Sequence, residues 1–182
     1  MAVTRLLLVI TFAALFAAFA KAETKPPDTV VSVDLNRYQG KWYEIARLPN
    51  RFQKQCVGNV AATYRLRADG KITVLNECKL KDGTTDRAEG IARLPDEGGP
   101  TSKLKVRFAP SFLSFLPFVW GDYWVLDLAP DYSHALIGDP ARKYMWILAR
   151  SPKISEQTYE QIVAKAKTQG FAVDQLIRTK QE

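Results

Sequence analysis

From Gly40 to Arg150 the sequence consists of short segments in which apolar and polar residues alternate, separated by residues typical of turns. Alternation with a period of two is the pattern of a β-strand with one face in a core and the other in solvent. Asp69-Gly70 separates two such segments, and Asp-Gly is a strong signal for a tight hairpin. The pattern predicts an all-β fold with eight strands, at residues 42–46, 60–66, 71–80, 86–94, 103–108, 122–128, 134–138 and 144–150.

Short links between most of these segments favour an antiparallel up-and-down order. Closing such a sheet into a barrel would remove both of its edges, and an eight-stranded barrel has room inside for one small ligand. A sandwich with a filled core fits the same strand count and the same alternation. The pattern alone therefore leaves both architectures open.

The C-terminal segment changes to a helical period. Ser155 can cap a helix over residues 155–169, and Gly170 can end it. Its apolar residues have the spacing i, i+3, i+4 and i+7, namely Tyr159, Ile162, Val163 and Ala166. We expect one face of this helix to pack on the outside of the sheet. Residues 171–179 alternate again and predict an added edge strand.

The first 22 residues have the features of an export signal. Arg5 precedes an apolar run of 15 residues, and an Ala-x-Ala site at 20–22 would place cleavage before Glu23. The run is shorter than the roughly 20 residues that span a membrane as a helix, although an uncleaved anchor is the alternative. No Cys lies near the cleavage site. We therefore expect a single exported domain at residues 23–182, soluble rather than lipid-anchored.

The charge argues against nucleic acid as a partner. Loss of residues 1–22 would remove Arg5 and Lys21 and no acidic residue, which lowers the formal net charge from +7 to +5. The basic residues often alternate with apolar ones, as in KLKVRF at 103–108. This pattern is typical of a solvated strand face, and no basic run or known nucleic-acid motif accompanies it.

Cys56 and Cys78 are the two cysteines of the chain. In an exported protein two cysteines usually pair, and a loop of this length gives a nominal stabilisation of roughly 3 kcal/mol. A redox pair or a pair of metal ligands is the alternative. Both are disfavoured because the spacing is not C-x-x-C and His134 is the single histidine.

Motifs of catalysis are missing from the sequence. It has no G-x-S-x-G, no H-E-x-x-H and no glycine-rich phosphate loop. We expect no enzymatic activity, no metal and no cofactor. A reduced Cys56 or Cys78 acting as a nucleophile is the alternative that the sequence leaves open.

Three segments resemble signatures of the lipocalin family. GKWYEIARLPNRF at 40–52 looks like the first signature in the form common to bacterial and apolipoprotein D-like members. APDYSHALI at 129–137 is similar to the Asp-Tyr segment between the sixth and seventh strands, and Arg150 falls where the family has an arginine ending the eighth. The resemblance covers about residues 33–180 and implies a barrel that binds a small hydrophobic molecule.

In an up-and-down barrel these three signatures meet at one end. In lipocalins the tryptophan plugs that closed end and the arginine packs across it, and the resemblance gives these roles to Trp42 and Arg150. A guanidinium over an indole can contribute roughly 0.5 to 2 kcal/mol. Gly40 would let the backbone pass close by, and Asp131 and Tyr132 complete the predicted closed end.

Alternation also assigns the side chains that face the interior. Several are small, which favours an open pocket over a filled interior. Asn76 would meet a ligand headgroup or water, or be satisfied by Tyr64 or by backbone. Trp120 and Trp146 would form part of the wall, or pack as ordinary core residues. The predicted ligand-binding residues are Val60, Ala62, Tyr64, Val74, Asn76, Ala88, Gly90, Val106, Phe108, Trp120 and Trp146.

The connection at residues 109–121 is unusually apolar for a loop. Together with Cys56 and Cys78 it is expected at the open end. It would serve as a ligand portal, a membrane contact or a homodimer contact through Phe112, Leu113, Phe115 and Leu116. A lid packed on its own barrel is the alternative.

These features favour a non-catalytic carrier of a fatty acid, a lysophospholipid or a similar lipid, the ligand class that the resemblance implies. Transport or storage in the maintenance of envelope lipids is the expected role, and the bacterial type of the resemblance suggests the periplasm and outer membrane biogenesis. Glu44, beside Trp42, is expected to pair or cap rather than catalyse. The alternatives are an enzyme acting on a lipophilic substrate and an interaction protein that uses the apolar loop.

Overall fold

The computed structural model describes residues 25–96 and 98–182, so the export signal predicted at residues 1–22 lies outside the described residues. The described part contains two α-helices and nine strands. The helices are α1 (Leu35–Tyr38) and α2 (Glu156–Thr168). The strands are β1 (Gly40–Arg47), β2 (Gly58–Leu66), β3 (Ile72–Lys79), β4 (Thr85–Arg93), β5 (Lys103–Arg107), β6 (Gly121–Leu128), β7 (His134–Gly138), β8 (Met145–Ala149) and β9 (Ile177–Arg178).

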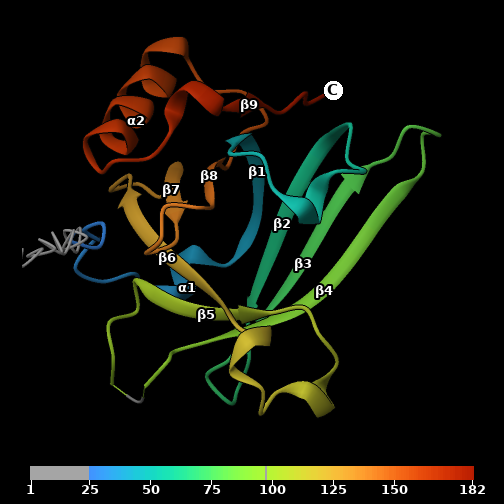
Figure 1. Ribbon diagram of the computed structural model, residues 1–182, viewed down its shortest axis with the longest axis vertical. Helices are drawn as coiled ribbons and strands as arrows, with labels where there is room; N and C mark the ends of the chain where they lie inside the picture. Colours follow the sequence, from blue (N-terminus) through green and yellow to red (C-terminus); the bar gives the residue numbers. More distant parts are fainter. Residues whose placement is uncertain (1–24, 97) are drawn as a thin grey trace, which may run out of the picture.

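Strands β1 to β8 form a closed antiparallel barrel (Figure 1). Each strand pairs with its neighbours in sequence, and β1 pairs with both β2 and β8. This double pairing closes the sheet, so the barrel is confirmed and a two-sheet sandwich is wrong. The chain enters β1 at the closed end, and the links that follow β1, β3, β5 and β7 lie at the open end.

Two apolar clusters lie on the two faces of this sheet. One fills the lower interior, which is the part next to the closed end, and includes Trp42, Tyr64, Val74, Leu104 and Ile137. The other lies between the outer face of the barrel and α2, and includes Leu126, Leu136, Met145, Ile162 and Phe171. The predicted packing of the C-terminal helix on the outside is therefore confirmed, and Figure 1 shows α2 beside the barrel wall.

Strand β1 changes the face that its side chains occupy. Its pairing with β8 is irregular between Glu44 and Ala46. Before this bulge Trp42 belongs to the interior cluster, whereas Ala46 belongs to the outer cluster under α2. A bulge adds one residue and thereby reverses the alternation that follows. Arg47 consequently points back toward Glu44 on the interior side.

The C-terminal segment fills a seam in the barrel wall. β1 pairs with β2 only as far as Tyr43 and Ala61, and β9 pairs with β1 beyond that point. The Gln181 Nε2 group donates hydrogen bonds to the carbonyl oxygens of Glu44 and Val60, at 2.8 Å each. The chain end thus bridges β1 and β2 where their own ladder has stopped.

The sheet is also incomplete between β4 and β5. Their pairing covers Ile91 to Arg93, although β4 extends back to Thr85 at the open end. The first part of β4 therefore has β3 as its partner and leaves its other edge free. Asp86, Arg87 and Glu89 place charges on that edge, a usual protection against unwanted strand pairing.

Residues 171–179 depart from the predicted edge strand. Phe171 is buried against α2, a 3₁₀ turn follows at Val173–Gln175, and only Ile177–Arg178 forms a strand. Packing of Phe171 overrides the local alternation. No helix within residues 25–96 and 98–182 has the length and apolar character to span a membrane.

Candidate functional site

The closed end is sealed by an arginine stacked on a tryptophan. The Arg150 guanidinium carbon lies 3.9 Å from the centre of the Trp42 ring. Its two terminal nitrogens donate to the carbonyl oxygens of Lys41 and Arg37, at 3.0 and 2.8 Å. Trp42 is fully buried, and its Nε1 donates to the Tyr38 carbonyl at 2.9 Å. The contact expected between Trp42 and Arg150 is present.

Two backbone positions at the closed end have a positive φ. Gly40 has a φ of +92°, and a Cβ there would lie 3.3 Å from Arg150 Nη1. Tyr132 has a φ of +63° and its hydroxyl accepts a hydrogen bond from the Asp34 amide. Asp131 caps the same turn through the Ser133 amide. The residues predicted to complete the closed end are therefore brought together there.

Three tyrosines form a layer above the tryptophan. The Tyr123 hydroxyl lies 2.8 Å from the Tyr38 hydroxyl and 2.9 Å from that of Tyr64. The Tyr38 ring also packs on Trp42, with centroids 4.8 Å apart. Burial raises the pKa of Tyr64 to about 12 and raises the pKa of Tyr38 and Tyr123 well above 10.0. All three hydroxyls are therefore protonated at neutral pH.

The middle of the interior is apolar. Ala62, Tyr64 and Val74 are buried in the interior cluster, and Val106 packs against it. Val60 is also buried. Ala62, Tyr64 and Val74 agree with the predicted inward face, and alternation was sufficient to find them because the β2–β3 ladder is regular from Ala61 to Leu66. Val60 lies at the register shift between Gly58 and Ala61, and its place on the inward face stays a prediction.

The upper interior is accessible from the open end. Asn76 is half-buried between its strand partners Ala62 and Ala88, and Ala88 is exposed although it shares a face with the buried Gly90. A Cβ on Gly90 would lie 2.7 Å from the Phe108 ring. Phe108 therefore crosses the inner side of β4 and remains 42% exposed.

Trp120 does not lie on the interior wall, which corrects its assignment as a ligand-binding residue. Its ring stacks against the guanidinium groups of Arg93 and Arg107, at 4.4 and 5.2 Å from its centre. These arginines alternate with the inward residues of β4 and β5, so they and Trp120 occupy the outer face. A loop residue has no strand period, and alternation could not place it.

A charged cluster lies on the interior side near the open end. Glu44 is 2% exposed and accepts from Arg47 Nη1 at 2.7 Å and from Gln53 Nε2 at 2.6 Å. The Thr179 hydroxyl also donates to Glu44. Gln53 Oε1 in turn accepts from Trp146 Nε1 at 3.0 Å. Glu44 therefore pairs, as expected, and the cluster fixes the Trp146 ring in the wall.

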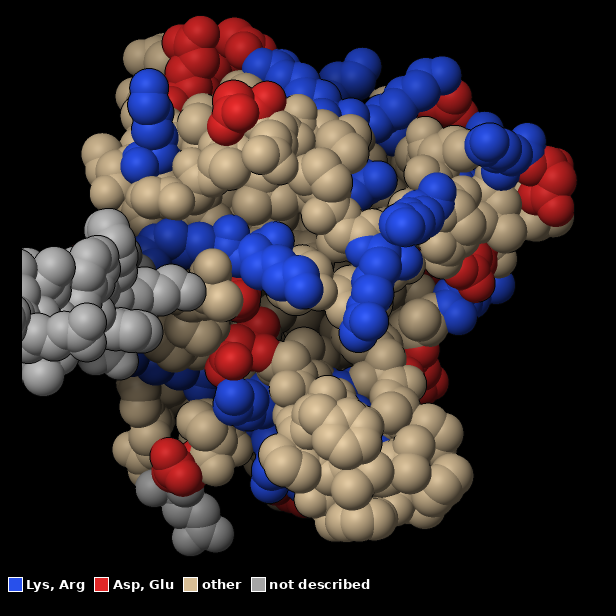
Figure 2. Space-filling view, in the orientation of Figure 1, with Lys and Arg blue, Asp and Glu red and all other residues tan. Residues whose placement is uncertain are grey.

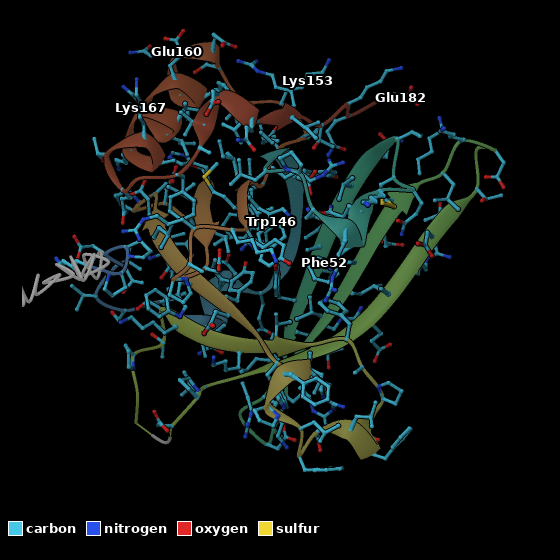
Figure 3. All side chains as sticks on the ribbon, viewed as in Figure 1. Phe52, Trp146, Lys153, Glu160, Lys167 and Glu182 are labelled. Carbon is cyan, nitrogen blue, oxygen red and sulfur yellow. A yellow bond between two sulfur atoms is a disulfide. The ribbon has the colours of Figure 1, made fainter. Side chains whose placement is uncertain are left out.

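Aromatic rings continue from this cluster to the rim. Tyr144 lies between Trp146 and Phe52, with ring centroids 6.1 and 5.5 Å away. Figure 3 labels Phe52 and Trp146, which lie close together near the centre of the view. Phe52 is 54% exposed. One side of the opening is thus lined by aromatic groups.

A disulfide stabilises the open end. Cys56 and Cys78 form this disulfide, which ties the loop after β1 to the end of β3. The predicted disulfide is confirmed. Because neither thiol is free, the alternative of a cysteine nucleophile is wrong.

The loop between β5 and β6 projects from the open end and forms an apolar protrusion. Phe112, Phe115 and Phe118 are 73%, 77% and 81% exposed. Figure 2 shows the protrusion as an uncharged area at the lower right, with Lys and Arg side chains beside it. The structure thus contradicts the alternative of a lid packed on its own barrel.

Reasoning from the sequence missed several of these groups. Tyr38 and Tyr123 join Tyr64 in the floor, and Arg47 joins Glu44 after the bulge. Tyr123 could have been found from its alternation with the buried Val125 on β6. Arg47 could not, because one extra residue in β1 reverses its side, and no local signal marks the bulge.

Comparisons with known proteins agree with this geometry. A family model for a lipocalin-like domain matches residues 33–181. The chain is 46% identical to temperature-induced lipocalin-1 of Arabidopsis thaliana, over 87% of this chain and 85% of the relative. It is 40% identical to the outer membrane lipoprotein Blc of Escherichia coli K12, over 96% of both chains. It is 35% identical to apolipoprotein D of Rattus norvegicus, over 85% of this chain and 83% of the relative.

Solved structures with lower identity share the fold. Insecticyanin of the tobacco hornworm Manduca sexta superposes with a TM-score of 0.65 and 23% identity, over 88% of this chain and 85% of that chain. Lobster apocrustacyanin A1 gives a TM-score of 0.63 at 18% identity, over 88% and 92%. The family model over residues 33–181 and the relatives at 35% to 46% identity show that the chain belongs to the lipocalin family.

Proposed function

We propose that this protein is a non-catalytic carrier that binds a fatty acid, a lysophospholipid or a similar lipid inside its barrel. The observation that carries the proposal is the gradient of accessibility along the interior. The walls near Trp42 are apolar and buried, whereas the inward-facing Ala88 is exposed at the open end. An amphipathic molecule would place its chain in the apolar part and its headgroup near the opening.

The energetics of such binding need no special chemistry. Burial of an acyl chain contributes about 0.8 kcal/mol per methylene before the costs of association. Asn76 and the Glu44–Arg47 pair lie at the level where a headgroup would remain, and they supply both hydrogen-bond donors and hydrogen-bond acceptors. The role that we infer is transport or storage of lipid in the cell envelope after export, in the periplasm if the source is bacterial. The relatives named outer membrane lipoprotein support this setting.

Blocking the upper interior tests the proposal. Ala88→Trp places a large ring inside the opening at an exposed position, so we expect at least a tenfold loss of palmitate affinity without unfolding. Glu89→Trp is the matched control, because the next residue of β4 points outward. Isothermal titration calorimetry measures the affinity, and circular dichroism checks the fold. Equal affinities in the folded Ala88→Trp variant and the wild type would refute the interior site.

The apolar protrusion supports a second role at the same end. We propose that residues 111–119 contact a lipid surface with anionic headgroups while the ligand enters or leaves. Three adjacent phenylalanines with more than 70% exposure form a larger apolar surface than scattered single residues do. Arg93 and Arg107 hold Trp120 at the base of the loop and add positive charge beside it.

Vesicle flotation tests this contact. We expect binding to vesicles of phosphatidylglycerol and phosphatidylcholine, and at least a fivefold reduction in Phe115→Ser. Val31→Ser is the control, because Val31 is 93% exposed outside the loop. Absence of vesicle binding in the wild type would contradict the proposal. If Phe115→Ser instead abolished a concentration-dependent dimer, the protrusion would be a homodimer contact.

A further inference from the structure

The layer of three tyrosines above Trp42 contains a hydrogen-bond donor that the protein does not use. Tyr123 lies between Tyr38 and Tyr64, and its hydroxyl is within 2.9 Å of each. Each neutral tyrosine has one hydroxyl proton and can also accept. Three hydroxyls therefore supply three protons to two hydrogen bonds. Whichever hydroxyl donates in each of the two hydrogen bonds, one O–H group remains without an acceptor among the three tyrosines.

Tyr123 is the central hydroxyl of the three, and its side chain is the least buried. Tyr38 and Tyr64 are 2% and 5% exposed, whereas Tyr123 is half-buried and packs on the interior cluster. Trp42 offers no acceptor from below, because its Nε1 donates to the Tyr38 carbonyl. Tyr123 can accept from both neighbours, which leaves its own proton without an acceptor in the layer.

A buried donor without an acceptor is unfavourable, and a ligand that provides one gains the full value of the hydrogen bond. The acceptor should be neutral. The nearest cation, Arg150, lies against Trp42 and is held by two backbone carbonyls. An ionised group at the floor would therefore be buried without a direct ionic partner.

We propose that the Tyr38–Tyr64–Tyr123 cluster is a binding subsite for a neutral carbonyl oxygen at the end of the ligand that enters the barrel first. This inference rests on the proposed function, since it requires a ligand that occupies the interior. It adds a selection that burial of a chain does not provide. Among ligands with acyl chains of equal length, the tyrosine layer favours those with a ketone, aldehyde or ester oxygen at the end that enters first.

A pair of matched ligands tests the subsite. The probes are a saturated long-chain fatty acid and the same acid with a ketone at the penultimate carbon. We expect the wild type to bind the keto acid about fivefold more tightly, as one net hydrogen bond predicts. The triple variant Tyr38→Phe/Tyr64→Phe/Tyr123→Phe, which has no hydroxyl in the layer, should bind both acids equally. Tyr159→Phe, on the outer helix α2, should keep the preference.

Vibrational spectroscopy provides a readout that does not depend on a variant. The carbonyl band of the isotopically labelled ketone should shift to lower frequency when bound to wild-type protein, as hydrogen bonding requires. A band at its apolar-solvent position, equal affinities in the wild type, or a preference that persists in the variant with all three tyrosines changed to Phe would each overturn the subsite. Failure of both acids to bind would instead contradict the proposed carrier function, on which the subsite rests.

Discussion

Single residues at the closed end show how a few side chains seal a barrel. Trp42 fills the end of the interior, and Arg150 covers its ring from the far side. Gly40 is required because its backbone has a positive φ and passes within contact distance of the guanidinium. The signature motif is therefore a structural plug. The tyrosine layer lies directly above it.

Arg150→Ala should lower the free energy of unfolding by about 2 to 3 kcal/mol. The variant loses the stacking contact with Trp42 and the hydrogen bonds to two carbonyls. Arg150→Lys should recover part of the loss, because an ammonium keeps the charge but not the planar fork. Urea denaturation measures both variants. An unfolding midpoint for Arg150→Ala equal to that of the wild type would contradict the role assigned to the stack.

At the scale of elements, the bulge in β1 and the C-terminal segment act together. The bulge separates the upper part of β1 from β2, and the chain end occupies the resulting seam. Gln181 joins the two strands, and Thr179 reaches the carboxylate of Glu44. The tail therefore completes both the wall and the interior charged cluster.

Gln181→Ala should destabilise the protein by about 1 to 2 kcal/mol, because two buried strand carbonyls lose their donor. Lys180→Ala is the matched control. Its side chain pairs with Glu182 in solvent, where ion pairs contribute little. Hydrogen exchange should show faster opening of β1 and β2 near the rim in Gln181→Ala only. Equal stability of the two variants would argue that the seam is held by backbone pairing alone.

For the whole molecule, the barrel has two ends with different chemistry. The closed end combines a tight plug with neutral hydroxyls, and the open end combines a disulfide, a charged cluster and exposed aromatic groups. α2 covers one outer face of the barrel (Figure 1). In the proposed carrier, this polarity would give the ligand one route of entry and one orientation.

The tyrosine layer should limit stability at alkaline pH. In the unfolded chain the tyrosines ionise near pH 10, whereas burial raises the pKa of Tyr64 to about 12 in the fold and that of Tyr38 and Tyr123 well above 10.0. The contribution of these buried tyrosines to the free energy of unfolding is therefore complete below pH 10. It declines as the pH rises through the pKa values of the folded state, by up to about 1.4 kcal/mol per pH unit for each tyrosine.

Tyrosinate absorbance during a pH titration measures how many tyrosines have ionised, and urea unfolding at each pH measures the stability. Three of the seven tyrosines of the chain should ionise late, and the unfolding midpoint should fall over the same range. Ionisation of all seven near pH 10 with the fold intact would contradict the buried, neutral layer.

Much of the fold was predictable because its signals are local. The period of two identified all eight strands of the barrel, and Ser155 with the apolar spacing after it identified α2. Cys56 and Cys78 form the predicted disulfide. The edge strand predicted at 171–179 is present only at Ile177–Arg178, because Phe171 packs under α2 and a 3₁₀ turn follows it. The predicted side of Trp120 was wrong, because its ring packs on Arg93 and Arg107.

The sequence by itself determined the strands, the outer helix, the disulfide and the residues of the plug, since alternation, capping and motif spacing act over a few neighbouring positions. Only the tertiary structure decided which groups meet inside. Tyr38 and Tyr123 are 85 positions apart, and Glu44 and Thr179 are 135 apart. Closure of the barrel and one bulge bring them together, and such long-range contacts leave no local period in the sequence.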